Sequence, residues 1–277
     1  MAAATEHVDI TQLIATKTLA EGFAAVGFAA VGPAQSMPVY EQWLAEGFAG
    51  EMDYLRRHAA LRTHPDHIIP GAKSIIAVAA RYPKNENPGA GFSTYARGQD
   101  YHDVLRRKLL SLGEFINAFH PLNVCRVCVD SAPLPEREWA MRAGLGWQGK
   151  QGQLVNPTAG CCIVLGFLLV DIELEPSVPL ENQCGSCQCC MDSCPTGAAM
   201  GDARVDARRC LSYLTIEHKG SIPAEWQTAV AGTLFGCDCC TAVCPWNARA
   251  TAPVMAELEL RDPLPSPEAC LAMDVAA

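Results

Sequence analysis

Apolar and polar positions along the chain follow two different periods. Apolar residues recur at helical intervals from Thr11 to Phe23, with a stop near Gly22, and again from Val104 to Phe119. This spacing gathers apolar side chains on one face, so both segments are predicted to be amphipathic helices. Leu134 to Ala143 has the same spacing and stops at Gly144, which predicts a third helix.

Shorter apolar runs are typical of buried strands. These runs are Ser74–Ala80, Val124–Val129 and Cys161–Val170. Strands and helices are therefore expected to alternate, and Asp130 stands at a strand end, where a carboxylate is well placed for chemistry. The run ending at Val170 is the longest and is too short to cross a bilayer, so no membrane span is predicted.

Glycine and proline mark the breaks between these elements. Gly144–Gly152 is glycine-rich, which predicts an irregular loop whose backbone can approach a ligand closely. It has neither the phosphate-loop nor the dinucleotide fingerprint. The prolines from Pro176 to Pro179 predict a boundary, giving domains 1–178 and 179–250. Residues 251–277 are predicted to be an irregular tail with one short helix before the end.

Composition narrows the class of protein. The chain has 277 residues, of which 49% are hydrophobic, and this is enough for a sizeable core. A net charge of −9 argues against a broad non-specific nucleic-acid surface but leaves local basic patches possible. Fifteen cysteines and no recognisable export signal indicate a reducing compartment, so a cytoplasmic protein is expected.

Two cysteine runs carry the most specific chemistry. The first, Cys184 to Pro195, reads C-x2-C-x2-C-x3-C-P, the bacterial ferredoxin spacing in which three cysteines bind one [4Fe-4S] cluster and the fourth binds another. The second run spans Cys237 to Pro245. The predicted ligands are Cys184, Cys187, Cys190 and Cys244 for one cluster and Cys194, Cys210, Cys237 and Cys240 for the other. Cys189 and Cys239 fall between ligands and are expected not to bind iron.

Two other uses of these cysteines are less consistent with the sequence. A disulfide framework fits poorly because the chain is large and has no recognisable signal peptide. Structural zinc accepts C-x2-C pairs, but zinc sites rarely contain two interleaved runs that end in Cys-Pro. Iron–sulfur clusters are the favoured prediction.

Several further segments resemble the epoxyqueuosine reductase family. They are Glu51–Leu55, Ile69–Lys73, Tyr95–His102, Val129–Pro133, Glu136–Ala140, Arg142–Trp147, Cys210–Glu217 and Cys244–Asn247. The resemblance extends through most of the chain in the family's order. It implies a cytoplasmic oxidoreductase that reduces epoxyqueuosine to queuosine at the wobble position of tRNA anticodons, the last step of queuosine biosynthesis.

The resemblance also implies the cofactors and the fold. The cofactors are cobalamin and two [4Fe-4S] clusters. The fold class is α+β, with a cobalamin-binding α/β catalytic domain followed by a ferredoxin-like two-cluster module, similar to corrinoid reductive dehalogenases. Cobalt must be reduced, and clusters deliver single electrons, so an external donor such as a flavodoxin or ferredoxin reductase system is expected. The protein is expected to be a monomer.

By resemblance, Asp130 is the proton donor, although an aspartate before Ser-Ala-Pro is also a common cap or turn residue. Lys219 is implied to face the tRNA, and its alternative is an ordinary surface lysine. The role of His102 stays open, and Arg106–Lys108 is more typical of a solvated helix face. The implied cobalamin contacts, each of which is also compatible with packing or capping, are Arg62, Tyr95, Asp130, Leu154, Asn156, Ser212 and Asp238.

The chain departs from the family pattern at Gln148–Leu154 and at Cys161–Cys162, which puts nearby cobalamin contacts in doubt. Family members commonly continue into a helical-repeat domain that grips the anticodon stem-loop, and this sequence stops at Ala277. Weaker tRNA affinity or a partner is therefore expected. Two alternative functions stay open: a corrinoid-dependent reductase of a small molecule, and a ferredoxin-like electron carrier that binds no cobalamin.

Overall fold

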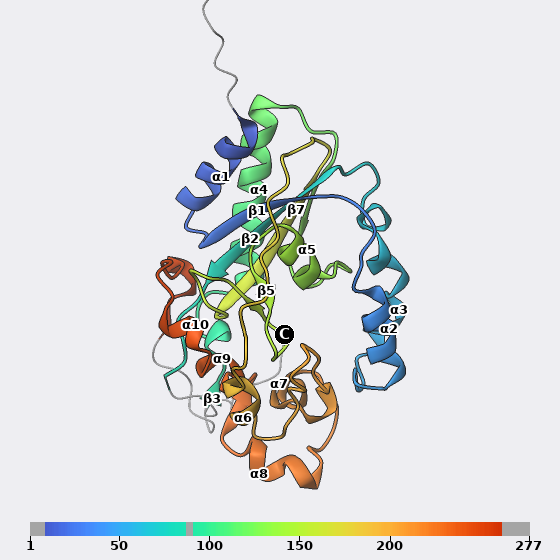
Figure 1. Ribbon diagram of the computed structural model, residues 1–277, viewed down its shortest axis with the longest axis vertical. Helices are drawn as coiled ribbons and strands as arrows, with labels where there is room; N and C mark the ends of the chain where they lie inside the picture. Colours follow the sequence, from blue (N-terminus) through green and yellow to red (C-terminus); the bar gives the residue numbers. More distant parts are fainter. Residues whose placement is uncertain (1–8, 87–90, 262–277) are drawn as a thin grey trace, which may run out of the picture.

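An antiparallel sheet of four strands forms the centre of the protein, as the computed structural model, which describes residues 9–86 and 91–261, shows (Figure 1). Its order is β1-β2-β7-β4, and each neighbouring pair is antiparallel. The strands are β1 (Ala25–Ala30), β2 (Ser74–Arg81), β7 (Ile163–Val170) and β4 (Cys125–Cys128). Helices combined with an antiparallel sheet confirm the α+β class.

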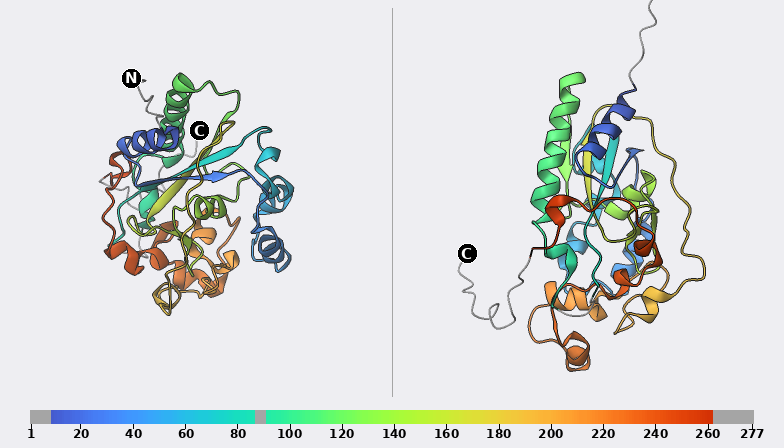
Figure 2. Two further views of the ribbon diagram at one scale, coloured as in Figure 1. Left: turned by 45° about the horizontal axis from the view of Figure 1, so that its top comes forward. Right: turned by 90° about the vertical axis from the view of Figure 1, so that its left-hand side faces the viewer.

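Helices cover both faces of this sheet (Figure 2). On one face lie α1 (Ile10–Ala20) and α4 (Tyr101–Phe119), and on the other lies α5 (Glu136–Arg142). Successive side chains of a strand point to opposite faces, so Val78 packs in the α1 and α4 core while Ala77 packs in the α5 core. Burial on both faces explains why β2 is a continuous apolar run rather than an alternating one.

Most of the predicted elements are present, with two differences. The first helix ends at Ala20, and a strand that the sequence did not indicate, β1, follows it. Alanine and glycine dominate β1, and its identity as a strand comes from pairing along the whole of β2. The predicted irregular loop contains a short strand, β5 (Trp147–Gln148), which pairs with β6 (Leu154–Val155).

The cysteine-rich half consists of short elements. They are α6 (Cys189–Asp192), η4 (Ala207–Arg209), α7 (Leu211–Ile216), η5 (Ala224–Trp226), α8 (Gln227–Val230), β8 (Thr233–Phe235), α9 (Cys239–Ala242) and α10 (Pro245–Ala248). Strand β8 pairs in parallel with β3 (Gly91–Phe92), which precedes η3 (Thr94–Ala96). This pairing joins the cysteine-rich half to the loops that follow β2.

An early segment of the chain also packs on the cysteine-rich half. It holds α2 (Met37–Ala45) and α3 (Asp53–Arg57) and leads into η1 (Ala60–Thr63) and η2 (Pro65–His67). Trp43 Nε1 donates to the Val205 carbonyl at 2.7 Å, and the Glu51 N–H donates to the Tyr213 hydroxyl at 2.8 Å. This segment therefore belongs by its contacts to the second predicted domain as well as the first.

The last described residues are irregular, but they are part of the core. They contain only the short η6 (Ala256–Leu258), and the Met255 N–H donates to the Arg81 carbonyl at 2.9 Å. Met255 and Leu258 are buried in the same apolar cluster as α4. The short helix predicted before Ala277 lies outside the described residues. Across residues 9–86 and 91–261, no helix is long and apolar enough to span a membrane.

Candidate active site and cluster module

Asp130 stands in a tight loop between β4 and α5. Its φ is +52°, a left-handed conformation that is uncommon for a residue other than glycine. Its backbone N–H donates to Glu136 Oε1 at 2.7 Å. Its exposed side chain places Oδ2 3.3 Å from Nε2 of His102, and Nδ1 of the same ring lies 2.8 Å from Oδ1 of Asp100. The histidine thus links two carboxylates.

Three phenols and a second carboxyl group surround Asp130. Burial raises the pKa of Tyr54 and of Tyr95 to about 12, and it also raises the pKa of Tyr101; the Asp130 charge adds to all three shifts. These phenols therefore stay neutral at physiological pH. Burial raises the pKa of Glu136 to about 7. Burial opposes protonation of His102, but its hydrogen bonds to the two neighbouring carboxylates outweigh this and raise its pKa.

Some of these neighbours received no role from the sequence. Glu136, Glu217 and Tyr54 lie in segments that carry the family resemblance, but their spacing alone gave no chemical signal. Tyr54 donates to Glu217 Oε1 at 3.1 Å, which brings α3 to the end of α7. A carboxylate within each of those segments was the available clue.

Arg62 connects η1 to the loop of Asp130. Its Nη1 donates to the Leu134 carbonyl at 3.2 Å, and its guanidinium lies 5.8 Å from the centre of the Tyr40 ring. Its buried Nε has no hydrogen-bond partner within the described part of the chain.

The other predicted cobalamin contacts differ in how free their side chains are. Leu154 is buried in β6. Asn156 is occupied internally, since its Nδ2 donates to the Leu145 carbonyl at 2.6 Å and its Oδ1 accepts the Ala159 N–H at 2.7 Å. Ser212 is half-buried, and its N–H helps that of Tyr213 to oppose the burial that raises the pKa of the Cys210 thiol.

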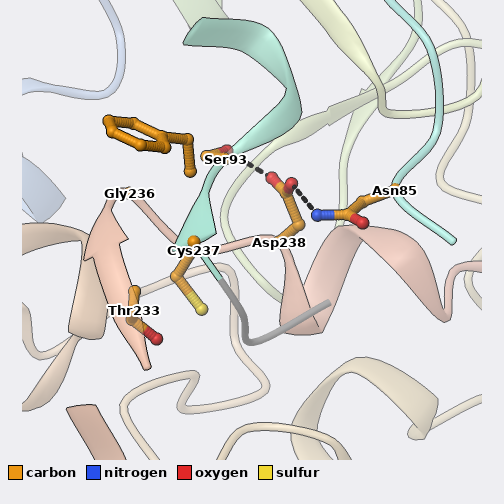
Figure 3. A pocket seen from close by; sticks show the side chains of 8 residues that line it. Asn85, Ser93, Thr233, Gly236, Cys237 and Asp238 are labelled. Carbon is orange, nitrogen blue, oxygen red and sulfur yellow. Dashed lines mark hydrogen bonds between the residues drawn. The ribbon is translucent and has the colours of Figure 1, made fainter. Parts of the chain in front are cut away.

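Asp238 is buried and its carboxylate is fully engaged within the protein (Figure 3). It accepts hydrogen bonds from Asn85 Nδ2 at 2.8 Å, from Ser93 Oγ, and from Thr94 N and Oγ1 at 2.8 and 2.9 Å. These bonds attach the loop that bears Tyr95 to the second cysteine run. A direct contact between Asp238 and cobalamin would have to use its backbone.

The predicted cluster cysteines lie opposite one another. The pKa of Cys190 is raised first by burial and then by three neighbouring thiols, those of Cys244, Cys184 and Cys187. The pKa of Cys240 is raised by burial and then by the thiols of Cys210, Cys194 and Cys190. Facing thiols that resist ionisation need cations between them to become thiolates, which is what cluster iron supplies. This arrangement supports the predicted ligand sets.

The remaining cysteines and Lys219 have separate places. Cys189 is exposed, and Cys239 has a pKa lowered to about 7 by its hydrogen bond with Cys237. No group of three or more His, Cys, Asp or Glu side chains in the described ranges could hold one metal ion. A single ion is not what the cysteine spacing predicts, since each thiolate of a cube binds a different iron. Lys219 is exposed, and its N–H donates to Glu51 Oε2 at 2.9 Å.

The chemistry of these residues also fits cobalamin. Besides Arg62 Nε, two buried donors, Trp147 Nε1 and Gln151 Nε2, have no hydrogen-bond partner among the residues described. Both belong to the β5–β6 region, which also carries Leu154 and Asn156. A corrin ring has peripheral amide carbonyls that can accept from such donors.

Paired cysteine runs beside an exposed aspartate, a histidine and neutral phenols define an iron–sulfur oxidoreductase. Residues 183–247 match the family described as 4Fe-4S double cluster binding domain, and residues 62–131 match Epoxyqueuosine reductase QueG, DUF1730. The epoxyqueuosine reductase of Escherichia coli K12 is 42% identical over 276 residues, covering 95% of this chain and 73% of that protein. This chain therefore belongs to the epoxyqueuosine reductase family.

Further relatives agree with this assignment. The Aliivibrio fischeri epoxyqueuosine reductase is 42% identical over 83% of this chain and 65% of its own length. A crystal structure of epoxyqueuosine reductase with a tRNA-Tyr epoxyqueuosine-modified stem loop has a TM-score of 0.82 and 32% identity, covering 91% of this chain and 69% of that one. The expected oxidoreductase class and the expected cofactors, cobalamin and two [4Fe-4S] clusters, are confirmed.

Proposed function

We propose that this protein reduces epoxyqueuosine to queuosine in tRNA, with Asp130 as the proton donor. The observation that carries the proposal is Asp130 at the head of the α5 loop, linked to His102 and lying within the family match at residues 62–131. A structure of the Bacillus subtilis epoxyqueuosine reductase, with a TM-score of 0.78 and 31% identity to this chain, is described as having its catalytic aspartate loop swung out of the active site.

The reaction needs two electrons and two protons. Both carbon–oxygen bonds of the epoxide break, a carbon–carbon double bond forms, and the oxygen leaves as water. Bound cobalamin supplies the reducing metal centre, and the clusters deliver electrons one at a time. Asp130 gives a proton to the departing oxygen, and His102 can return one to Asp130 because its own pKa is raised.

The proposed cofactor sites follow from the same geometry. The first cluster is held by Cys184, Cys187, Cys190 and Cys244, and the second by Cys194, Cys210, Cys237 and Cys240. Cobalamin lies against Arg62, Tyr95, Asp130, Leu154, Asn156, Ser212 and Asp238, with Asn156 and Asp238 acting through the backbone that they position. The proposed domain limits are 1–178 and 179–250, with the remainder as a terminal segment.

The proposed partner is the tRNA anticodon stem-loop, because the structural relative described above contains one. Lys219, exposed beside Glu51, is placed to contact a phosphate as a point charge. We also propose a monomeric cytoplasmic enzyme that takes its electrons from a flavodoxin or ferredoxin reductase system. The cysteine content favours this reducing compartment.

Anaerobic reconstitution followed by turnover of an epoxyqueuosine stem-loop tests the proposal. Asp130→Asn removes the proton, so its turnover should fall by about 10²- to 10⁴-fold. Its iron content, cobalamin content and stem-loop affinity should match those of the wild type. Asp103→Asn, an exposed change on α4, is the control.

The other outcomes separate the competing functions. Full activity of Asp130→Asn would contradict its role as the proton donor. Wild-type protein that binds cobalamin and both clusters but forms no queuosine would favour a corrinoid reductase of a small molecule. Protein that binds clusters but no cobalamin would favour an electron carrier.

A further inference from the structure

The backbone of the active-site loop is held by a side chain. Asp130 and Ala203 are the residues other than glycine with positive φ in the described ranges. A left-handed residue persists only where its surroundings favour it. At Asp130 the surroundings include Glu136, which is on the first turn of α5 and accepts the Asp130 N–H at 2.7 Å.

The rest of the loop is anchored from two other elements. Arg62, from η1, donates to the Leu134 carbonyl at 3.2 Å, and His102, from α4, contacts the Asp130 carboxylate at 3.3 Å. Neither contact reaches the Asp130 backbone. Glu136 therefore supplies the hydrogen bond that acts on the twisted peptide itself.

Glu136 is a costly residue for this position. Burial and the nearby Asp130 charge disfavour its ionised form, and the guanidinium groups of Arg137 and Arg62 offset this in part, leaving the pKa at about 7. The phenol of Tyr101 and the thiol of Cys128 also face it. Because its pKa is raised from 4.5, the folded state binds this proton more tightly than the unfolded state, so stability falls as pH rises from about 4.5 to about 7.

A glutamine would fill the same space without this loss. A carboxyl group that lowers stability at neutral pH suggests a functional use rather than a packing use. The use available from the geometry is strong acceptance of the Asp130 N–H, because an ionised oxygen is a stronger acceptor than an amide oxygen.

We propose that Glu136 is the positioning residue of the active-site loop, whose carboxylate holds the Asp130 backbone in its left-handed conformation and so places the Asp130 carboxyl group for proton transfer. This inference rests on the proposed function of Asp130. Glu136 acts through Asp130 and makes no contact with substrate. Loss of the acceptor frees the 129–135 loop and leaves the cofactor and tRNA sites in place.

Two variants of the reconstituted enzyme test this role, with Glu114→Gln on the exposed face of α4 as the control. Glu136→Ala removes the acceptor, so kcat should fall by about 10- to 100-fold with KM for the stem-loop unchanged within about twofold. Glu136→Gln keeps a neutral acceptor and should restore most of kcat. Amide hydrogen exchange of residues 129–135 should accelerate in the alanine variant and stay near wild type in the glutamine variant.

The pH profile adds a readout that a purely structural role would not change. As the pH falls below about 7, Glu136 takes up a proton and becomes a weaker acceptor, so wild-type kcat should lose activity on this acid side. Glu136→Gln should lack this limb, and Glu114→Gln should keep it.

Either of two results would overturn the proposal. One is wild-type kcat and wild-type loop exchange in Glu136→Ala. The other is a glutamine variant as inactive as Asp130→Asn with unchanged loop exchange, which would make Glu136 a proton-transfer group. Loop exchange is measured without substrate, so it tests Glu136 even if the protein fails to reduce epoxyqueuosine.

Discussion

Among single residues, Asp238 shows how a predicted binding residue can act through the structure around it. Four donors from three residues converge on its buried carboxylate. Such a group is stable only while its charge is balanced by these hydrogen bonds. Its side chain therefore holds Thr94, and with it the neighbouring Tyr95, against the loop of Cys237.

Asp238→Ala should lower the free energy of unfolding by about 3–5 kcal/mol, since it leaves several buried donors without an acceptor. The loss should appear in urea unfolding, with a parallel fall in iron content because the second cysteine run loses its anchor. Asp103→Ala on the exposed surface should change stability by less than about 0.5 kcal/mol. An Asp238 variant as stable as this control would refute the anchoring role.

Among the elements, the join between β7 and the second cysteine run depends on close backbone approach. Gly160 has φ +74°, and a Cβ there would lie 2.1 Å from Oδ1 of Asn247. That oxygen accepts the Cys161 N–H at 2.7 Å, while Nδ2 of the same side chain donates to the Thr241 carbonyl at 2.6 Å. Asn247 thereby fixes the turn that carries Cys244.

Gly160→Ala should displace Asn247 and reduce the iron bound per protein, because the Cys244 turn loses its attachment to β7. Gly22→Ala is the matched control: its φ is +92°, but no atom lies within 4 Å of the added Cβ. Both variants should lose about 1–2 kcal/mol of stability from the left-handed backbone. Iron analysis should separate them, and equal iron content in both would contradict this account.

For the molecule as a whole, the segment 251–261 closes the structure. Met255 and Leu258, each 1% exposed, enter the core beneath α4, and Lys108 of that helix lies 2.9 Å from Glu257. The chain returns in this way from the second cysteine run to the first domain. The expected terminal tail is therefore irregular in backbone but fixed in position.

Met255→Ala should cost about 2–5 kcal/mol in chemical unfolding, as expected when a buried side chain leaves a cavity. Leu260→Ala removes a similar volume from a side chain in the same segment that is 37% exposed, and it should cost under about 1 kcal/mol. Equal and small losses in both variants would show that this segment contributes little to the core.

The sequence by itself determined the features that depend on local spacing. The cysteine spacing predicted two clusters, the helical period predicted α4, and apolar runs predicted β2 and β7. These signals are local because one loop, one helix face or one strand is enough to produce them. The resemblance then assigned a role to Asp130 that its place at a strand end only suggested.

The tertiary structure alone decided how distant segments meet. β1 is a strand because β2 pairs along its length, and Glu136 matters because the loop turns its carboxylate onto the Asp130 amide. Asp238 is an anchor because it receives donors more than a hundred residues away in sequence. Burial, pairing and shifts in pKa arise from neighbours that chain order does not specify, so no local pattern could have shown them.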